Sequence, residues 1–284
     1  MLRKLIKYDI KSVARVFWFV AISVLGLSVF GASVLRGTIA LMDEYSLSLF
    51  SLLGLLISIG CIFLIYSSMW VTFFLTYWRY YKNLFSDEGY LTFTLPVSRK
   101  QLLLSKTINA LIWSAAQALL LTVSVLIYLL IVPEGKDGHF FSPFLFDLIG
   151  ETFGSLWKNV GAWLFAYIPQ IFAILFVATL FQIGMIQFSI TVGAIIAKRV
   201  RLLVAVGVYY ALSGALSTCL TILIRFAIPT IGEGIKELML YTSPNSEHLV
   251  VLLFLMLFAV VVAALSAILH FATLDVLERK LNLP

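Results

Sequence analysis

Six long apolar runs divide the chain, and short basic or polar segments separate them. An α-helix needs about 20 consecutive apolar residues to cross the hydrocarbon core of a bilayer. The pattern therefore predicts an all-α polytopic membrane protein, with six transmembrane helices in a single transmembrane domain over residues 1–284. The expected spans are 16–35, 47–78, 102–132, 160–197, 202–228 and 249–273.

The first 15 residues precede the first span and have two chemically different helical faces. Apolar side chains recur at the spacing of one helix face, and lysines take another. This is the pattern of an amphipathic helix that lies in the membrane interface. The residues concerned are Leu2, Leu5, Ile6 and Ile10 on the apolar face, and Lys4, Lys7 and Lys11 on the basic face. The apolar run that follows is too long for the core of a signal peptide, so we expect an uncleaved first span.

The fourth run, 160–197, is too long for one straight span. We expect it to tilt, to project into the cytoplasm, or to bend at Pro169. Two segments on the outer side are too apolar for free loops. Residues 134–159 are expected to lie against the outer headgroups, and 230–241 to form a short outer helix.

Composition supports a lipid environment. The chain is 62% hydrophobic and 12% charged, whereas soluble domains are about 45–50% apolar and about 25% charged. The formal net charge of +6 comes from Lys and Arg clusters beside the apolar runs. Such clusters bind lipid headgroups and set topology, so nucleic acid is not an expected partner.

The distribution of Lys and Arg predicts the orientation. Fifteen of the 20 basic residues lie in the N-terminal segment, the segments after spans two and four, and the C-terminal tail. All four belong to the same side of a six-span protein. The positive-inside rule places that side, and both chain ends, in the cytoplasm.

Catalytic and metal-binding chemistry has no visible basis in the sequence. All fourteen acidic residues lie outside the span centres, which lowers the expectation of an ion-driven carrier. His139, His248 and His270 are separated, with no acidic neighbour at metal-ligand spacing. There is no G-x-x-x-x-G-K-[ST] phosphate loop, H-E-x-x-H or G-x-S-x-G motif. We therefore expect no catalytic residue, metal ligand or cofactor site in this chain.

Uncharged polar side chains within the spans have two interpretations. They form interhelical hydrogen bonds, or they line a polar patch on a substrate path. The residues in question are Asn109, Gln117, Gln182 and Gln187. Small residues in the spans are expected to allow close helix packing, at Gly26, Gly31, Gly54, Gly60 and Gly214.

Residues 79–106 carry the most specific signal. A short helix is expected from Asn83 to Glu88, with Gly89 as its stop. Pro96 biases Leu95 towards an extended backbone, and Ser98 is placed to cap the helix that leads into span three. The short helix would display aromatic and acidic side chains to a protein partner rather than form an ordinary interfacial loop. The predicted docking residues are Asn83, Leu84, Phe85, Ser86, Asp87, Glu88, Gly89 and Tyr90.

The string from Glu88 to Lys106, EGYLTFTLPVSRKQLLLSK, resembles a segment found in ABC-2 type permeases of Gram-positive bacteria. These are the membrane subunits of ATP-binding-cassette exporters. The similarity is fairly specific over about 20 residues, and the expected topology matches the family over nearly the whole chain.

The resemblance implies a multi-pass permease domain in the plasma membrane, not an enzyme, that assembles with a second permease subunit. A cytoplasmic ATPase subunit would bind ATP and Mg, and Asn83–Tyr90 would be the coupling helix that docks into it. The transported substrate would be hydrophobic or amphipathic, for example a peptide. The alternative is a membrane sensor or scaffold that binds a partner through the same loop without transport. A third interpretation is an intramembrane enzyme or a secondary carrier.

Overall fold

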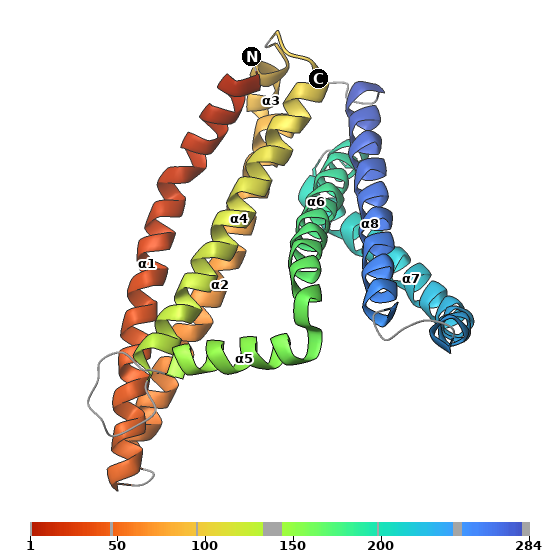
Figure 1. The fold of residues 1–284 in the computed structure, drawn as a ribbon. Helices are drawn as coiled ribbons and strands as arrows, with labels where there is room; N and C mark the ends of the chain where they lie inside the picture. Colours follow the sequence, from red (N-terminus) through yellow and green to blue (C-terminus); the bar gives the residue numbers. More distant parts are fainter. Residues whose placement is uncertain are drawn as a thin grey trace. The chain divides into compact units, whose positions relative to one another are not determined.

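The computed structural model describes residues 2–45, 48–94, 96–132, 144–197, 199–240 and 246–279. These residues form helices joined by short connections, without a strand among them (Figure 1). Six helical stretches are long and apolar enough to cross a membrane. The prediction of an all-α polytopic membrane protein is confirmed. The helices are α1 (Leu2–Tyr45), α2 (Leu49–Phe85), α3 (Asp87–Phe93), α4 (Arg99–Ile131), α5 (Phe144–Val160), the 3₁₀ turn η1 (Gly161–Trp163), α6 (Leu164–Ile196), α7 (Arg201–Leu240) and α8 (Ser246–Arg279).

The chain divides into two compact parts. The first part contains residues 3–78 and 108–159, and the second contains 79–107 and 160–284. The ends of α2 and α4 that flank α3 therefore belong to the second part, together with α6, α7 and α8. Each part is described by itself.

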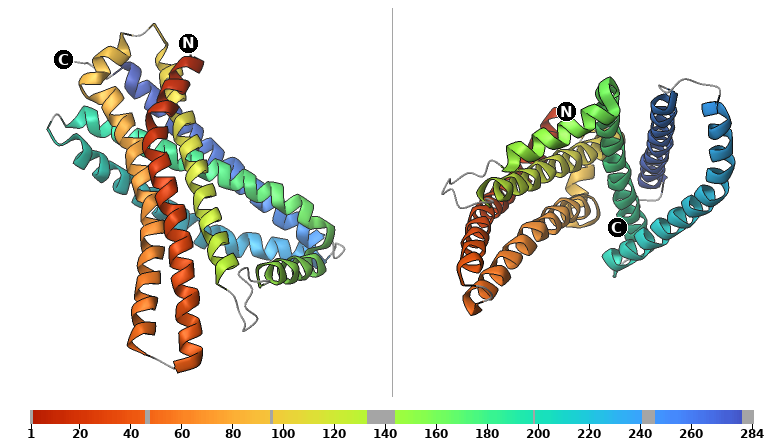
Figure 2. Two further views of the ribbon diagram at one scale, coloured as in Figure 1. Left: turned by 90° about the vertical axis from the view of Figure 1, so that its left-hand side faces the viewer. Right: turned by 60° about the horizontal axis from the view of Figure 1, so that its bottom comes forward.

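In the first part, α1, α2 and α4 lie side by side (Figures 1 and 2). Ala21, Val24, Ile65 and Leu120 form a buried cluster between these three helices. Without a hydrophobic driving force between helices in lipid, close contact depends on small residues and interhelical hydrogen bonds.

Two glycines of the first part allow such contact. A Cβ on Gly31 would lie 2.7 Å from Cys61 Cβ, and one on Gly54 would lie 2.0 Å from Thr38 Oγ1. Close packing at these positions is confirmed. The same expectation is wrong for Gly26, Gly60 and Gly214, where a Cβ would meet no described atom within 4 Å. Within its own part, none of these three glycines closely approaches a described neighbouring helix.

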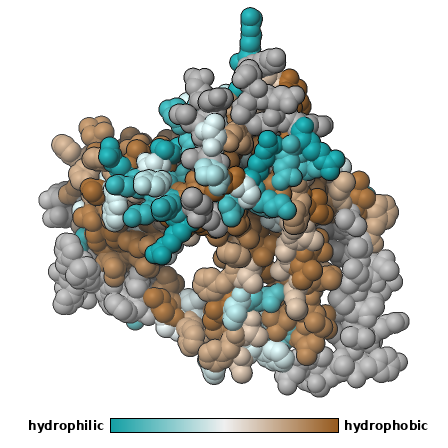
Figure 3. Space-filling model, turned by 90° about the horizontal axis from the view of Figure 1, so that it is seen from above, coloured by the Kyte–Doolittle hydropathy of each residue, from teal (hydrophilic) through white to brown (hydrophobic). Residues whose placement is uncertain are grey.

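The second part is built around α6, which packs against both α7 and α8. A Cβ on Gly193 of α6 would lie 2.6 Å from the backbone N and Cα of Ala205 in α7. The two helices touch there almost backbone to backbone. Figure 3 looks onto the side that carries α3; hydrophilic residues lie in the upper and middle area of this view and hydrophobic residues lie around and below them.

Several predicted boundaries differ from the structure. The expected interfacial helix 1–15 and the first span 16–35 are one continuous helix, α1, of 44 residues. At 1.5 Å per residue it is roughly 66 Å long, about twice the ~30 Å of a hydrocarbon core. Part of α1 must therefore lie outside the core, and the interfacial position of its first turns stays a prediction.

The fourth apolar run is interrupted, but not at Pro169. The interruption is the turn η1, where Gly161 has a φ of 56°. This left-handed backbone conformation favours glycine. Pro169 lies inside α6, in its second turn, without ending the helix. The helix is thus broken at Gly161, eight residues before Pro169, and a tilt, a projection or a bend at Pro169 stay the three alternatives for the run.

The outer segments differ from the prediction in extent. The expected outer helix at 230–241 is helical to Leu240 but continues α7 without a break. Residues 144–159 of the predicted headgroup segment form most of α5, whereas 134–143 lie outside the described residues. Of the side chains of α5 that the structure describes, 147–159 are exposed and Val160 is half-buried.

Candidate functional site

The short helix predicted near residue 83 exists, but it begins later. Asn83, Leu84 and Phe85 are the last residues of α2, and the separate short helix α3 runs from Asp87 to Phe93. The predicted stop at Gly89 is wrong, since Gly89 lies inside α3. The non-helical residues between α3 and α4 are 94–98, of which Leu95 lies outside the described residues.

The structure gives Gly89 a different physical role. Its N–H donates to the carbonyl of Ser86 at 2.7 Å, at the start of α3. A Cβ at this position would lie 2.6 Å from the backbone oxygen of Leu84. Gly89 is therefore required because α3 folds back closely on the end of α2, where no side chain has room.

The prediction that this segment displays its side chains to a partner is wrong at two positions. Leu84 has 0% exposure and Phe85 has 5%. Both side chains are packed inside the protein, so they are unavailable to a partner in this conformation. Glu88 is exposed, whereas the side chains of Asp87 and Tyr90 lie outside the described residues. The exposed positions that follow are Thr94, Pro96, Ser98, Lys100 and Gln101.

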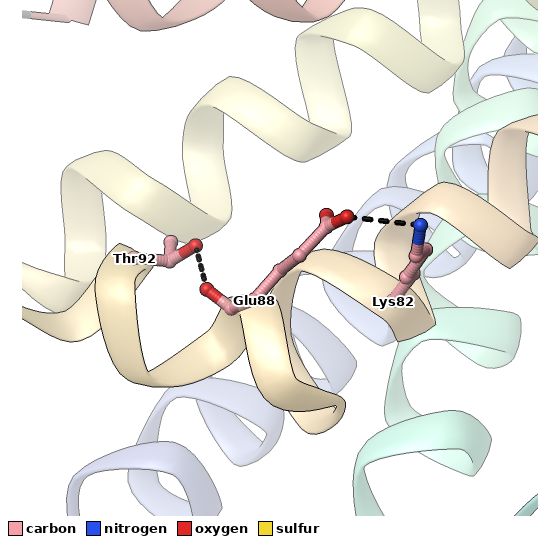
Figure 4. Close-up of polar contacts among 3 residues, drawn as sticks. All are labelled: Lys82, Glu88 and Thr92. Carbon is pink, nitrogen blue, oxygen red and sulfur yellow. Dashed lines mark hydrogen bonds and ion pairs between the residues drawn. The ribbon is translucent and has the colours of Figure 1, made fainter.

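A polar network joins the end of α2 to α3 and α4. Lys82 Nζ lies 2.9 Å from Glu88 Oε1, and Thr92 Oγ1 donates to the backbone oxygen of Glu88 at 2.9 Å (Figure 4). With its amide oriented to satisfy both neighbours, Asn83 donates to Glu88 Oε2 at 3.0 Å and accepts from Lys106 Nζ at 2.9 Å. The exposed Lys82–Glu88 pair alone contributes little stability, but the network fixes the orientation of α3.

The start of α4 is held by two local interactions. Ser98 Oγ accepts from the N–H of Gln101 at 3.3 Å, so the predicted N-cap is confirmed. The guanidinium of Arg99 lies over the Phe93 ring, 5.8 Å from its centroid. The last residue of α3 and the first of α4 are thus in contact across the short connection.

Two arginines link this region to the remaining helices of the second part. Arg99 Nη1 donates to the backbone oxygen of Leu277 in the last turn of α8. Arg201 Nη1, from the first residue of α7, donates to the backbone oxygen of Phe85 at the end of α2. The last four carbonyls of a helix have no partner within it, and each arginine satisfies one of them.

Helix electrostatics explains why the arginines occupy these positions. Arg99 and Arg201 each begin their own helix, where the positive end of the macrodipole disfavours a cation. Each instead places its charge at the C-terminal, negative end of another helix. The two contacts therefore connect α3, through its flanking helices, to both α7 and α8.

A buried hydrogen bond connects α2 to α6 near the same end. The hydroxyls of Tyr80 and Thr191 are 2.9 Å apart, and the two residues are 3% and 0% exposed. Thr191 Oγ1 donates its proton to the backbone oxygen of Gln187 at 2.7 Å. Tyr80 must therefore be the donor to Thr191.

Replacing Tyr80 with phenylalanine is expected to lower the free energy of unfolding by about 1 kcal/mol, the net value of one buried hydrogen bond. Thr191 keeps its bond to Gln187, so a larger loss is not expected. The measurement is reversible unfolding in mixed detergent micelles. Tyr210→Phe is the matched control because Tyr210 is 70% exposed, and a surface change should stay within about 0.5 kcal/mol. Equal losses in the two variants would contradict the assigned bond.

The four polar residues predicted for a substrate path make hydrogen bonds within their own parts. In the first part, Gln117 accepts from Thr72 at 2.8 Å and donates to Ser68 at 2.9 Å. Asn109 accepts from Trp113 within the same helix, at 3.0 Å. The bonds of Gln117 join α4 to α2, as the interhelical interpretation expects, whereas the bond of Asn109 stays within α4.

In the second part, the two glutamines of α6 point to different neighbours. Gln182 donates to the Tyr209 hydroxyl of α7 at 2.7 Å. Gln187 accepts from the Thr107 hydroxyl of α4 at 3.0 Å. The structure does not bring these two side chains together on one surface.

Sequence reasoning missed Arg201, Tyr80 and Thr191 as members of this region. In the sequence, Arg201 counts only among the basic residues that set topology, and nothing assigns Tyr80 a partner. An arginine as the first residue of a helix is a local signal, because it opposes its own helix dipole. No local signal identifies Thr191, which lies 111 residues from Tyr80 in the sequence.

The region forms a mechanical link between helices of the second part. Among the described residues, no group of three or more His, Cys, Asp and Glu side chains is arranged to hold a metal ion. Hydrogen bonds tie the helix ends that flank α3 to α6, α7 and α8. A displacement of α3 would therefore act on several membrane helices of the second part.

Comparisons with known proteins do not extend this description. No family model matches the chain, and neither a curated protein nor a solved structure matches it. What the sequence and structure establish together is a multi-pass α-helical membrane protein.

Proposed function

We propose that this chain is the membrane subunit of an ABC-2 type exporter. The observation that carries the proposal is the attachment of α3 at both of its flanks, through Arg99 to α8 and through Arg201 to α7. A docking helix transmits force only if it is stiff and connected to the helices that must move. The resemblance of residues 88–106 to the permease segment supports the same role.

In this proposal, ATP and Mg bind a separate cytoplasmic ATPase subunit, in agreement with the missing phosphate loop. Two permease subunits sit in the plasma membrane with their chain ends in the cytoplasm. Closure of the ATPase dimer pushes on α3. ATP shifts the transporter between two conformational states because it binds them with different affinities. The cargo is hydrophobic or amphipathic, since the described spans carry no acidic group near their centres.

The side chains proposed to contact the ATPase subunit differ from those predicted from the sequence. Because Leu84 and Phe85 are buried, they support the fold beneath the docking surface. Glu88, Pro96 and Lys100 are exposed and are the positions expected to meet the ATPase subunit.

One observation favours the alternative of a sensor or scaffold that binds a partner without transport. Asn109 and Gln117 are engaged in packing hydrogen bonds within the first part. Gln182 and Gln187 likewise bond to different helices within the second part. Neither part shows a shared polar surface formed by these residues, as a polar substrate path would require.

Site-specific photo-cross-linking tests the proposal. A benzophenone amino acid in place of exposed Lys100 should form an adduct with an ATP-binding protein in membranes of the source cell. The same amino acid in place of exposed Asn159 of α5 is the control, because α5 follows α4 and is predicted to lie on the opposite side of the membrane. Adducts are identified by mass spectrometry and by labelling with azido-ATP.

Two results would contradict the exporter proposal. One is an adduct at Lys100 with a protein that does not bind ATP, which would favour the sensor or scaffold. The other is an equal yield of the ATP-binding adduct from both positions, which would remove the assignment of α3 to the cytoplasmic docking side.

A further inference from the structure

The helix α5 carries its charged and its large apolar side chains on opposite sides. Asp147, Glu151 and Lys158 are the charged ones among its 17 residues. At 3.6 residues per turn, these three side chains fall within about 40° around the helix axis. The large apolar side chains that the structure describes spread over about 180°, centred on the opposite side. This apolar face consists of Leu148, Ile149, Phe153, Leu156 and Trp157.

The apolar face of α5 is exposed. Its five side chains are between 39% and 55% exposed. The rings of Phe153 and Trp157 stack along this face, with centroids 6.2 Å apart. On the side of the charged residues, a Cβ on Gly150 or Gly154 would meet no described atom within 4 Å. Most of the apolar face is therefore left for lipid or for another molecule.

The turn that follows α5 lies at the edge of the membrane. Within the second part, Trp163 of η1 stacks on His248, with ring centroids 5.8 Å apart, and the Tyr167 hydroxyl lies 3.2 Å from His248 Nδ1. His248 is in the first turn of α8, between the charged Glu247 and an apolar run that begins at Leu249. This is the level at which α8 enters the hydrocarbon core, and Trp and Tyr are typical of that level.

The chain connects α5 closely to this level. The three-residue turn η1 joins α5 to α6, and α6 has 33 residues without a charged side chain. Val160, the last residue of α5, precedes Trp163 by three residues, which span at most about 11 Å. The end of α5 is therefore held near the boundary between the headgroups and the hydrocarbon core.

Neither water nor hydrocarbon alone suits α5 at this boundary. In water, the apolar face would remain a contiguous exposed patch, which is unusual for a surface without a partner. In the hydrocarbon core, three charged side chains of one short helix would lose their hydration. The membrane interface accommodates both faces, because apolar side chains reach about 5–10 Å into the acyl boundary while the charged side chains stay hydrated.

We propose that α5 is a lipid-binding helix that lies in the plane of the membrane, with its apolar face inserted into the leaflet predicted to be the outer one. The sequence predicts only that residues 134–159 lie against headgroups, whereas the geometry of α5 assigns the inserted face. Two carboxylates and one ammonium give the charged face a net charge of −1, which does not attract anionic headgroups. Insertion therefore depends on apolar burial, and a zwitterionic lipid is a sufficient partner. The proposal rests on the membrane-spanning helices and not on the exporter function.

Spin-label accessibility of the full chain in phosphatidylcholine nanodiscs tests this proposal. The two native cysteines, Cys61 and Cys219, are replaced by alanine, and single cysteines in α5 are labelled with a nitroxide. Two labels are placed on the apolar face and two on the charged face, at positions that are all exposed. The variants are Ile149→Cys and Phe153→Cys on the apolar face, and Glu151→Cys and Lys158→Cys on the charged face.

The two faces should differ in the reagent that reaches them. Labels on the apolar face should collide mainly with oxygen, which dissolves in hydrocarbon, and should lie about 5–10 Å below the headgroup level. Labels on the charged face should collide mainly with nickel-EDDA, which stays in water. Circular dichroism confirms that each labelled variant keeps its helical fold.

Three results would contradict the proposal. Access of nickel-EDDA to all four labels would place the apolar face in water. Exclusion of both reagents from the labels at positions 149 and 153 would show that a protein partner or a second copy of this chain covers the face. Adding phosphatidylglycerol to the nanodiscs should leave the depth of these two labels unchanged. Insertion only in its presence would show that anionic lipid, and not apolar burial, holds α5.

Discussion

Replacing Gly193 with alanine is expected to destabilise the protein, although alanine is the better helix former. The added Cβ would lie 2.6 Å from the backbone N and Cα of Ala205. Backbone atoms cannot rotate away as a flexible side chain can, so α6 and α7 must separate. Overpacking of this kind costs about 1–3 kcal/mol, and the loss should appear in reversible unfolding of the protein in mixed micelles.

The matched control makes the same chemical change on the facing helix. A Cβ on Gly207 of α7 would meet no described atom within 4 Å. Gly207→Ala should therefore leave stability unchanged or raise it by up to about 1 kcal/mol, through helix propensity. The change in the free energy of unfolding is therefore predicted to be negative for Gly193→Ala and zero or positive for Gly207→Ala. A stabilising Gly193→Ala would show that α6 and α7 do not meet at this position in the bilayer.

Gly193 also illustrates what the sequence does not reveal about packing. The glycines chosen from the sequence included Gly31 and Gly54, which do contact neighbouring helices, but also Gly26 and Gly60, which do not. A glycine marks a place where a close approach is allowed. Which face of a helix meets a neighbour depends on how helices that are far apart in sequence are rotated about their axes. That rotation cannot be predicted from the local pattern of a single sequence.

The number and type of the spanning helices were predictable because the hydrocarbon core imposes both length and apolarity. Helix ends were less predictable. α1 runs through the expected boundary at residue 15 because no Gly or Pro occurs before Gly26 to interrupt it. Likewise, α2 continues as a helix to Phe85, beyond the expected end of span two at residue 78, and that span boundary stays a prediction.

A short helix between spans two and three was predicted close to its actual place in the chain, but with the wrong exposed side chains. The sequence predicts a short helix from Asn83 to Glu88, whereas the structure has the short helix α3 from Asp87 to Phe93. Leu84 and Phe85 were expected to be exposed because they belong to a segment between two spans. They are buried because α2 extends past the predicted boundary and packs its last turn inside the second part.

Removing both helix-end arginines, in an Arg99→Ala, Arg201→Ala double variant, is expected to loosen α3 strongly. Each substitution leaves a C-terminal carbonyl without its charged donor, at Leu277 of α8 and at Phe85 of α2. A hydrogen bond to a charged group contributes about 1.5–3 kcal/mol, so the double variant should lose about 3–6 kcal/mol locally. Hydrogen exchange of the α3 amides in nanodiscs should become faster by about a hundredfold or more.

The control removes the same two charges from exposed positions nearby. Lys100 and Arg199 are both exposed. In a Lys100→Ala, Arg199→Ala double variant, the α3 amides should exchange at almost the wild-type rate. Lysine in place of the two arginines should restore only part of the protection, because an ammonium keeps the charge but lacks the planar fork of the guanidinium.

The result bears directly on how α3 would act on the membrane helices. If α3 exchanges faster only in the arginine double variant, its stiffness depends on the contacts to α7 and α8, as a force-transmitting element requires. Partner binding at Lys100 should then survive in that variant while the response of α7 and α8 is lost. If exchange in α3 is unchanged, the Lys82–Asn83–Glu88–Lys106 network holds the helix by itself. The arginines would then only cap helix ends, and the mechanical basis of the exporter proposal would fail.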